Sequence, residues 1–468
     1  MSLHTNPEFR RQLWLQISAT RLILAPVVIA IVVVVLAAVE SVDAGSIHGT
    51  AWVALSLVVL FWGTSAAGNS IRDEINERTW NQQRMSRLTP WQLTWGKLFG
   101  ATSYVWYVAS LCTLVTVFSD RNVGGTFGTF GTDKRAIEFV FLLSLALFAH
   151  CVALMAPLAV QSGVGDTRIS IPPIAVLAFI FVAFQATPDV RQRSSATASA
   201  DWFGVDATAQ MLSLVLMLSL AAWGLLGAWR AMRQALQVRQ IPWALPAFVA
   251  FIGVWIAGTT YLDDRSISIS ALVGATLALA AAAWVLMLWE PQSLFAWRRI
   301  RTHWAAGERP RAIAGVSAAT SVVLFAVIGA LLVAVMNAVS SGAEVTEVSP
   351  AGFFMKTATQ SRLDLASHGG PFLWLALVLL RDFAFTLLAD TFTTSPRRRS
   401  TVILLYLLFM YLAVPAALQA ASSEGSQWWL PSAHPAVPIV VALTTLLAML
   451  GALISRLPRT VTVIATKS

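Results

Sequence analysis

The sequence predicts an all-α polytopic membrane protein with about 12 transmembrane helices. Its mean hydropathy is +0.70, and 57% of its residues are hydrophobic. Only 12% of the 468 residues are charged, whereas soluble proteins carry about 25%. The apolar residues gather into twelve runs, and most of these approach the roughly 17 to 25 residues that a helix needs to cross a bilayer. These three observations exclude an ordinary soluble protein.

Six of the apolar runs lie in the first half of the chain. They cover residues 22–39, 52–67, 98–118, 137–160, 171–186 and 209–229. The second and fifth runs are short, and the fifth has Pro172 and Pro173 near its start, which a membrane helix tolerates when its neighbours satisfy the freed backbone groups. His150 lies in the fourth run without a second histidine at ligand spacing, so we expect a helix contact and no metal site.

The other six apolar runs lie in the second half. They cover residues 243–261, 269–289, 312–339, 371–388, 402–420 and 437–454. A short basic connection over residues 230–241 separates the two sets. The sequence therefore predicts two six-helix halves, residues 1–235 and residues 236–468. This division rests on the spacing of the apolar runs, because the two halves share no sequence repeat visible by eye. The alternative to two related halves is that the even number of spans is a coincidence.

Charge bias predicts the orientation of the chain. With both termini in the cytosol, most of the 32 lysine and arginine residues fall in inner loops, as the positive-inside rule requires. We therefore expect a multi-pass protein of the cell (inner) membrane. The net charge of +9 is then explained without nucleic acid as a partner. The two cysteines lie inside apolar runs and indicate neither a disulfide framework nor a metal site.

The longest polar run covers residues 71–97, between the second and third apolar runs. Its first part is expected to form a helix over residues 71–87, supported by an ion pair between Glu74 and Arg78 one turn later. The Thr89–Pro90 step is expected to end this helix.

The end of the polar run has the character of a membrane interface. Trp91 and Trp95 are residue types that favour this position, and Lys97 is expected to extend its ammonium out of the next span. A solvated helix lying on anionic lipid is the alternative interpretation of the whole segment.

The polar segment resembles a known transporter family. Glu77-Arg78-Thr79-Trp80, then Arg84, Leu88-Thr89-Pro90 and Gly96-Lys97, is similar to the cytosolic signature that precedes the third membrane helix of ABC-2 type transporter permeases. Residues 6–12 resemble the amphipathic N-terminal helix of that family. The resemblance covers roughly the first 120 residues, and the remainder is similar mainly in hydropathy.

This resemblance implies the permease subunit of an ABC exporter, a transport subunit rather than an enzyme. A separate cytosolic ABC ATPase, expected to be a dimer, would bind ATP and contact the helix over residues 71–87. No Gly-x-x-x-x-Gly-Lys-Ser/Thr loop occurs, so we expect this chain to bind no cofactor itself. The expected ATPase-coupling residues are Glu74, Glu77, Arg78, Thr79, Arg84, Arg87, Pro90 and Lys97.

The remaining expected partners are the lipid bilayer and either a second copy of the chain or a second permease. A fused pair of halves would instead act as a single chain. The polar segment over residues 290–311 is strongly basic and departs from the family pattern, so it is expected to contact lipid headgroups or the ATPase.

Arg381 and Asp382 stand near the middle of the tenth apolar run, where charge is costly. They are candidates for an intramembrane path or for a bond between helices, and neighbouring residues on a helix need not pair. A span that begins later, with the pair at an interface, is the alternative. Two other functions stay open: an ion-gradient-driven secondary transporter, and a membrane-embedded enzyme acting on lipid-linked substrates.

Overall fold

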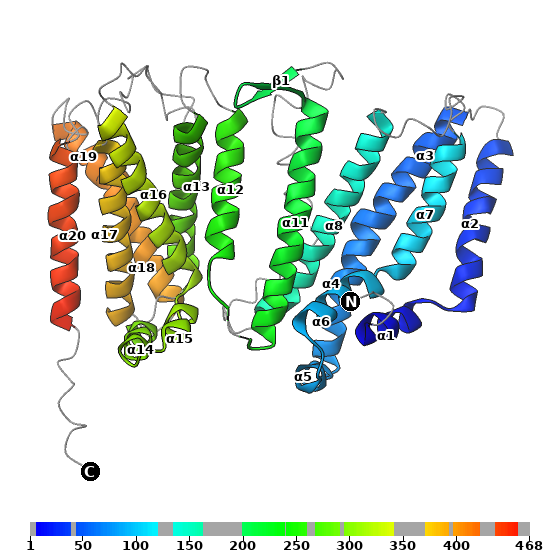
Figure 1. Cartoon of the computed structure of the whole chain (residues 1–468), viewed down its shortest axis with the longest axis horizontal. Helices are drawn as coiled ribbons and strands as arrows, with labels where there is room; N and C mark the ends of the chain where they lie inside the picture. Colours follow the sequence, from blue (N-terminus) through cyan, green and yellow to red (C-terminus); the bar gives the residue numbers. More distant parts are fainter. Residues whose placement is uncertain are drawn as a thin grey trace, which may run out of the picture. The chain divides into compact units, whose positions relative to one another are not determined.

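The computed structural model describes the chain in ten stretches, which form two compact units. The stretches are residues 6–38, 44–119, 134–161, 199–238, 240–259, 267–290, 294–340, 370–392, 396–421 and 436–456. The N-terminal unit comprises residues 1–200 and 207–240, and the C-terminal unit comprises residues 201–206 and 241–468. Figure 1 shows that nearly all described elements are helices.

The N-terminal unit is built from apolar helices and shorter polar ones. Its helices are α1 (Pro7–Gln16), α2 (Ala19–Ala38), α3 (Ala44–Leu57), η2 (Val58–Trp62), α4 (Gly63–Asn76), α5 (Trp80–Met85), α6 (Pro90–Trp95), η3 (Gly96–Gly100), α7 (Ser103–Ser119), α8 (Lys134–Gln161) and α11 (Ala209–Ala235). The α3, η2 and α4 segments follow one another without a break, because the residues at both junctions keep helical backbone angles. They form one long helix, whose C-terminal end belongs to the polar run over residues 71–97.

A short hairpin of β1 (Ser199–Trp202) and β2 (Val205–Thr208) precedes α11. Phe203 and Gly204 form its turn with φ angles of 52° and 74°. Two consecutive positive φ angles are typical of the two-residue turns whose twist matches that of the paired strands.

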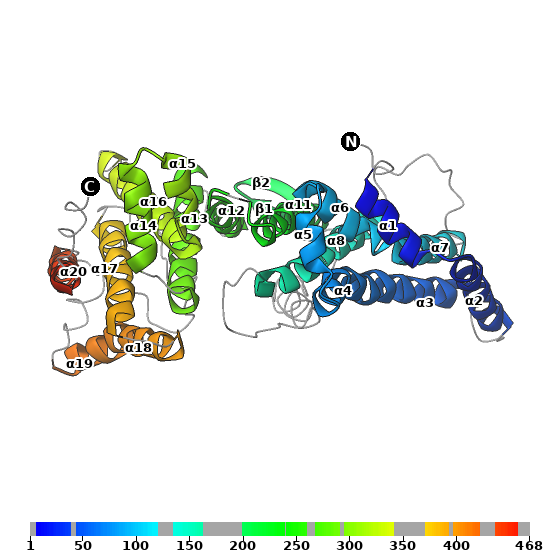
Figure 2. The same cartoon turned by 90° about the horizontal axis from the view of Figure 1, so that it is seen from below.

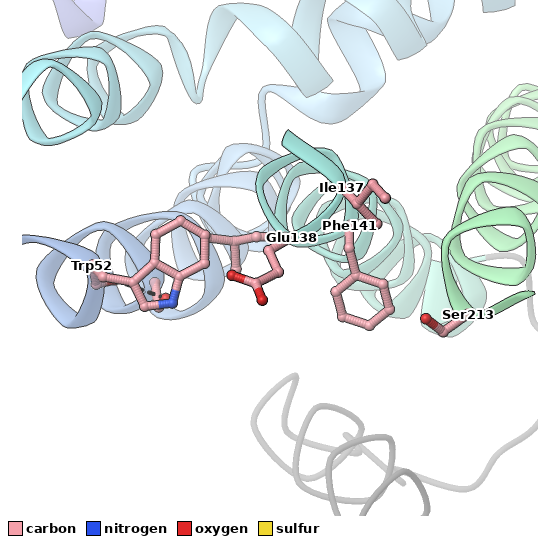
Figure 3. A pocket seen from close by; sticks show the side chains of 7 residues that line it. Trp52, Ile137, Glu138, Phe141 and Ser213 are labelled. Carbon is pink, nitrogen blue, oxygen red and sulfur yellow. Dashed lines mark hydrogen bonds between the residues drawn. The ribbon is translucent and has the colours of Figure 1, made fainter. Parts of the chain in front are cut away.

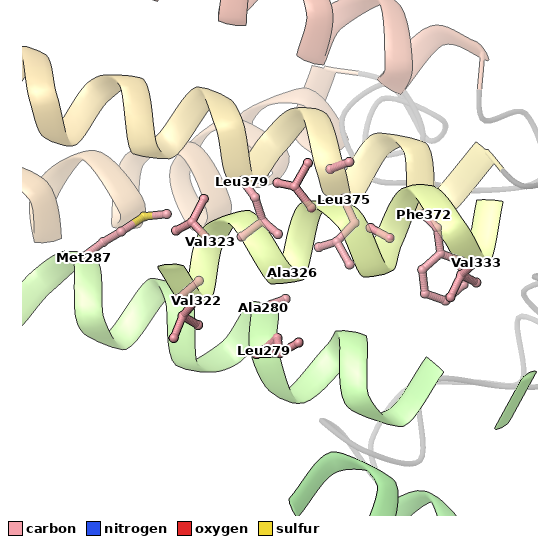
Figure 4. Packing of buried hydrophobic residues seen from close by; sticks show 14 residues of the cluster. Leu279, Ala280, Met287, Val322, Val323, Ala326, Val333, Phe372, Leu375 and Leu379 are labelled. Atoms are coloured by element: carbon pink, nitrogen blue, oxygen red, sulfur yellow. The ribbon is translucent and has the colours of Figure 1, made fainter. Parts of the chain in front are cut away.

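The C-terminal unit is also helical. Its helices are α12 (Ala244–Thr259), α13 (Ile267–Trp289), α14 (Leu294–Ala305), α15 (Arg309–Ala314), α16 (Ala318–Ser340), α17 (Gly370–Phe392), α18 (Pro396–Leu408), η5 (Phe409–Ala413), α19 (Val414–Ala421) and α20 (Ala436–Arg456). Figure 4 shows its main core, in which α13, α16 and α17 interdigitate. Buried alanines such as Ala283 and Ala330 let these helices approach closely, while Phe372 and Leu379 fill the space between them.

Small residues also bring α12 against α13. A Cβ atom on Gly253 would overlap the carbonyl oxygen of Gly274, so the two backbones touch at this point. Such contacts are typical of membrane helices, where association depends on close packing rather than on exclusion of water.

His150 of α8 makes a helix contact, as expected from the sequence. Its Nε2 atom lies 2.8 Å from the carbonyl oxygen of Val59 in the π-helical segment η2, and the side chain is fully buried. A π-helical turn shifts the backbone bonding from i+4 to i+5, which leaves a carbonyl group available to a neighbouring helix. Gly63 provides the space for the imidazole ring.

The described residues contain nine helices that are long and apolar enough to cross a membrane, or ten if the bent pair of α6–η3 with α7 is one span. The chain therefore has the character of an all-α polytopic membrane protein. Helix α12 corresponds to the expected seventh span but has only 16 residues. The expected fifth span, residues 171–186, lies outside the described residues. The number twelve and the two six-helix halves stay predictions.

Candidate functional site

The polar segment over residues 71–97 is not one helix, and the predicted helix over residues 71–87 is wrong. Helix α4 ends at Asn76, and Arg78 adopts a left-handed φ of 61°. The Arg78 amide donates to the Ile75 carbonyl at 3.1 Å and the Thr79 amide donates to the Glu74 carbonyl at 2.9 Å. These two bonds are those of a Schellman motif, with arginine at the position where glycine is usual. The motif satisfies the last carbonyl groups of α4 and redirects the chain.

Helix α5 is anchored by two side chains, Trp80 at its start and Gln83, which donates a hydrogen bond to Glu74. Trp80 is buried in a cluster with residues of α4, α6, α8 and α11, including Ile71, Leu93 and Leu154. The other end of α5 is exposed, since Arg84 lies at the surface and 80% of the Met85 side chain is accessible. The result is a short helix held to the unit by Trp80 and Gln83, with its other side chains accessible.

The predicted break at Thr89 and Pro90 is confirmed. Thr89 caps α6 in a capping box, in which its Oγ1 accepts from the Gln92 amide at 3.2 Å and its own amide donates to the Gln92 side chain at 2.9 Å. Pro90 occupies the first helical position, where its missing N–H costs nothing. The break was predicted from Pro90, and the capping box with Gln92 was not part of that prediction.

Two glycines at the start of the third span let α1 lie directly against η3. A Cβ atom on Gly96 would lie 2.6 Å from Glu8 Cγ, and one on Gly100 would lie 2.6 Å from Gln12 Cβ. Figure 2 shows α1 beside α6 and α7. The helix axis bends by 44° between α6–η3 and α7, directly after the residues that contact α1.

Lys97 lies at the centre of a buried ion-pair cluster, so the expectation that its ammonium extends out of the span is wrong. Its side chain is fully buried and its Nζ atom pairs with Glu74 of α4. The same Nζ atom lies 3.4 Å from Oε1 of Glu8 on α1. Two carboxylates from distant parts of the chain therefore stabilise the ammonium inside the protein.

Arg11 completes the cluster. Its guanidinium donates to both carboxylate oxygens of Glu8, at 3.0 and 2.9 Å, and also to Glu74. Gln83 of α5 donates to Glu74 as well. Glu74 therefore pairs with Lys97 and Arg11, and the expected pair with Arg78 is wrong. Arg78 is instead exposed.

The charge of Glu8 is maintained by its neighbours. Burial by itself would raise the pKa of the Glu8 carboxyl, but the hydrogen bonds from Arg11 and Gln12 and the charge of Lys97 outweigh burial and hold that pKa below its ordinary value of 4.5. The hydrogen bond to Glu8 is also the main reason that the pKa of Arg11 is raised. Glu8 is therefore anionic at neutral pH, and its charge is balanced by the surrounding cations.

The structure separates the predicted coupling residues into two groups. Glu74 and Lys97 are buried in the ion-pair cluster, and Thr79 is half-buried. The exposed members are Glu77, Arg78, Arg84 and Arg87. Pro90 is half-buried at the start of α6.

Sequence reasoning missed Glu8, Arg11 and Gln83. Glu8 and Arg11 are three residues apart on α1, which is a readable helical pair. Nothing in the order of residues connects that pair with Glu74 or Lys97, because the contact depends on how α1 packs on η3.

In the C-terminal unit, Arg381 and Asp382 pair with each other. The Nε atom of Arg381 donates to Oδ1 of Asp382 at 3.0 Å, and the two residues are 2% and 1% exposed. They lie near the middle of the 23-residue α17, which is itself a candidate span, so the alternative of a span that begins later or breaks at this pair is wrong.

Asp382 also accepts hydrogen bonds from two other helices. Its Oδ1 accepts from the Tyr406 hydroxyl at 2.8 Å, and its Oδ2 accepts from Trp284 Nε1 at 3.0 Å and from the Tyr411 hydroxyl. Residues five apart on an α-helix point about 140° apart. Tyr411 lies in the π-helical segment η5. The wider π-helical turn rotates the Tyr411 side chain toward the side of the helix that carries Tyr406. The carboxylate therefore connects α13, α17 and the α18–η5 segment.

A pocket of about 520 Å³ lies between α3, α8 and α11 of the N-terminal unit (Figure 3). It is lined by Trp52, Ser56, Ile137, Glu138, Phe141, Leu142 and Ser213. The lining is mainly apolar, with Glu138 as its one carboxylate. Within the described stretches, no group of three or more histidine, cysteine, aspartate or glutamate residues is arranged to hold a metal ion.

Comparisons with known proteins give no match. No family model matches the sequence, and neither the curated proteins nor the solved structures include a significant match.

Proposed function

We propose that this chain is the membrane-spanning permease subunit of an ATP-driven exporter of the ABC-2 type. Its substrate would be moved with energy from ATP hydrolysed by a separate cytosolic ABC ATPase. The observation that carries the proposal is the buried pair of Glu74 and Lys97, which joins the start of the polar segment over residues 71–97, on α4, to its end on η3, where the next apolar helix begins.

In this proposal the ATPase binds α5 and the turn that precedes it. Glu77, Arg78 and Arg84 offer exposed charges of both signs, and Met85 offers an exposed apolar side chain. A short helix with such a surface suits a groove on a partner protein. Trp80 would keep α5 attached to the unit while the partner moves it.

The ion-pair cluster would transmit the movement. Separating one partner from a buried ion pair costs roughly 3–5 kcal/mol, so a displacement of α5 would move α4, α1 and η3 together rather than break their contacts. The π-helical turn and the 44° bend at the start of α7 are where the movement would enter the next span.

The experiment is a mild-detergent purification of the full chain from its native membrane, with co-purifying proteins identified by mass spectrometry and assayed for ATPase activity. We expect a stoichiometric ATPase with a phosphate-binding loop, which is lost from the Glu77→Ala, Arg84→Ala double variant. The control is the Arg72→Gln variant. Arg72 is exposed and lies on α4, and this variant is expected to keep the partner. A chain that purifies alone and shows no ATP-dependent activity contradicts the proposal.

An ion-gradient-driven transporter is the second candidate, and the buried carboxylate of Asp382 is the observation that favours it. Gradient-driven transport needs a titratable or ion-binding group at membrane depth. Against this function, four donors already occupy the Asp382 carboxylate. Transport that continues without ATP and is abolished by Asp382→Asn would favour the second candidate over the first.

A further inference from the structure

Helices α14 and α15 join the ends of two apolar helices of the C-terminal unit. They connect α13 to α16, and Figure 1 shows them beside the ends of α16 and α17. Glu290 at the end of α13 accepts hydrogen bonds from the amides of Ala318 and Ala319 at 3.2 and 2.6 Å. This contact holds the end of α13 to the start of α16, so the intervening segment stays at the level where the apolar helices end.

One face of α14 is anchored to the unit. Trp297, Ile300 and Trp304 have the helical spacing of a single face. The Trp297 ring packs on Phe383 with ring centroids 6.2 Å apart, and Ile300 packs near Gly315. Trp304 lies beyond this contact, and 58% of its side chain is exposed. An exposed tryptophan at the end of a span is typical of a membrane interface.

The remaining surface of α14 and α15 is positively charged. Arg298, Arg299, Arg301, Arg309 and Arg311 occupy residues 294–315 with Glu308 as the only acidic residue. Glu308 already accepts from His303 at 2.8 Å and from Arg311. The hydrogen bonds from Arg311 and His303 lower the pKa of Glu308 to about 2. Its negative charge is therefore already paired with these two residues. Arg299 and Arg301 are exposed on α14 and have no acidic partner within the described stretches.

We propose that the exposed residues Arg299, Arg301 and Trp304 of α14 bind the headgroups of anionic phospholipids, Arg301 and Trp304 from neighbouring positions around the helix and Arg299 from its other side. The guanidinium group matches a phosphate with two parallel hydrogen bonds. The arginines lie at the end of the apolar helices, where phosphate groups of a bilayer are found, and Trp304 can enter the boundary between headgroups and acyl chains. This surface lies in the C-terminal unit, so the inference does not depend on an ATPase partner.

The test is a titration of the purified full chain in mild detergent with fluorescent phosphatidylglycerol and, separately, phosphatidylcholine. We expect tighter binding of phosphatidylglycerol. A basic residue near an anionic lipid surface contributes about fivefold in affinity. The Arg299→Gln, Arg301→Gln double variant should therefore bind phosphatidylglycerol about 25-fold more weakly and leave phosphatidylcholine binding unchanged. An equal affinity of the double variant and the wild type for phosphatidylglycerol overturns the proposal.

A matched control separates this surface from net charge. The Arg10→Gln, Arg21→Gln double variant removes the same charge from exposed positions in the N-terminal unit that lie outside the polar segment over residues 71–97. It should keep its phosphatidylglycerol affinity within about twofold, and an equal loss in both double variants overturns the proposal. Thermal unfolding midpoints equal to that of the wild type establish that the double variants are folded.

Trp304→Ala provides a second, independent measurement. Phosphatidylglycerol with brominated chains should quench less of the intrinsic fluorescence of Trp304→Ala than of the wild type, because an interfacial tryptophan contacts the chains. Unchanged quenching overturns the interfacial placement. If the arginine variants lose a co-purifying protein while phosphatidylglycerol binding is unchanged, the surface binds protein and the lipid proposal is overturned.

Discussion

The Nζ atom of Lys97 lies 3.4 Å from the carboxylate of Glu8, inside the protein, although one residue directly precedes the third apolar run and the other belongs to the N-terminal helix. Glu74 and Arg11 complete the cluster. Three helices that are separate in the sequence are thereby joined where the polar segment meets the membrane region.

Lys97→Met should strongly destabilise the N-terminal unit. It leaves the carboxylates of Glu8 and Glu74 with less compensating charge in a buried site, which costs roughly 3–5 kcal/mol. Thermal or denaturant unfolding of the purified chain in detergent measures the change. Arg87→Gln, at an exposed position, is the control and should stay within about 0.5 kcal/mol. A loss no greater than that of the control contradicts the structural role of Lys97.

The contribution of Glu8 to stability should depend on pH. Its folded pKa is lowered, so its stabilisation is present above the unfolded value near 4.5 and is lost as the pH falls through the folded pKa. The gap between the unfolding midpoints of the wild type and Glu8→Gln should therefore be full at neutral pH and should close in acid. Glu77→Gln, at an exposed position, serves as the control. A gap that is constant with pH contradicts the ionic role of Glu8.

Gly96→Ala should separate α1 from η3. The added Cβ atom would lie 2.6 Å from Glu8 Cγ, and such overpacking costs roughly 1–3 kcal/mol. Gly49→Ala is the matched control, because a Cβ atom there meets nothing within 4 Å. Limited proteolysis near the N-terminus, together with the unfolding midpoint, reports the change. Equal behaviour of the two alanine variants would show that α1 is not held by this contact.

Asp382→Asn should destabilise the C-terminal unit by roughly 3–5 kcal/mol, because it leaves the buried guanidinium of Arg381 without its counter-charge. Tyr406→Phe removes one hydrogen bond to the carboxylate and should cost about 1.5–3 kcal/mol. Tyr104→Phe removes an exposed bond to the Arg21 carbonyl and should cost less. Unfolding midpoints of the three variants check this order, and a Tyr104→Phe effect as large as that of Tyr406→Phe contradicts it.

The two polar segments should contribute unequally to ATP-driven transport. Glu77→Ala with Arg84→Ala should uncouple transport-linked ATP hydrolysis far more than Arg298→Ala with Arg299→Ala. The first pair belongs to the exposed segment joined to η3 by the ion-pair cluster, whereas the second pair belongs to α14. ATP hydrolysis and transport measured together in proteoliposomes test this difference. Equal losses would mean that both segments contact the ATPase.

The sequence by itself determined the helical membrane character of the chain, because apolar composition and run length are local properties that a bilayer selects directly. It also determined the break between Met85 and Pro90, since proline cannot continue a preceding helix. Only the tertiary structure decided that Lys97 is buried, that Arg78 takes a left-handed turn after α4, and that Asp382 receives donors from three helices. The burial of Lys97 and the donors to Asp382 depend on partners that are distant in the chain and meet only through helix packing. The turn at Arg78 is closed by local backbone bonds, but arginine stands where glycine is usual, so no residue type marked the turn in the sequence.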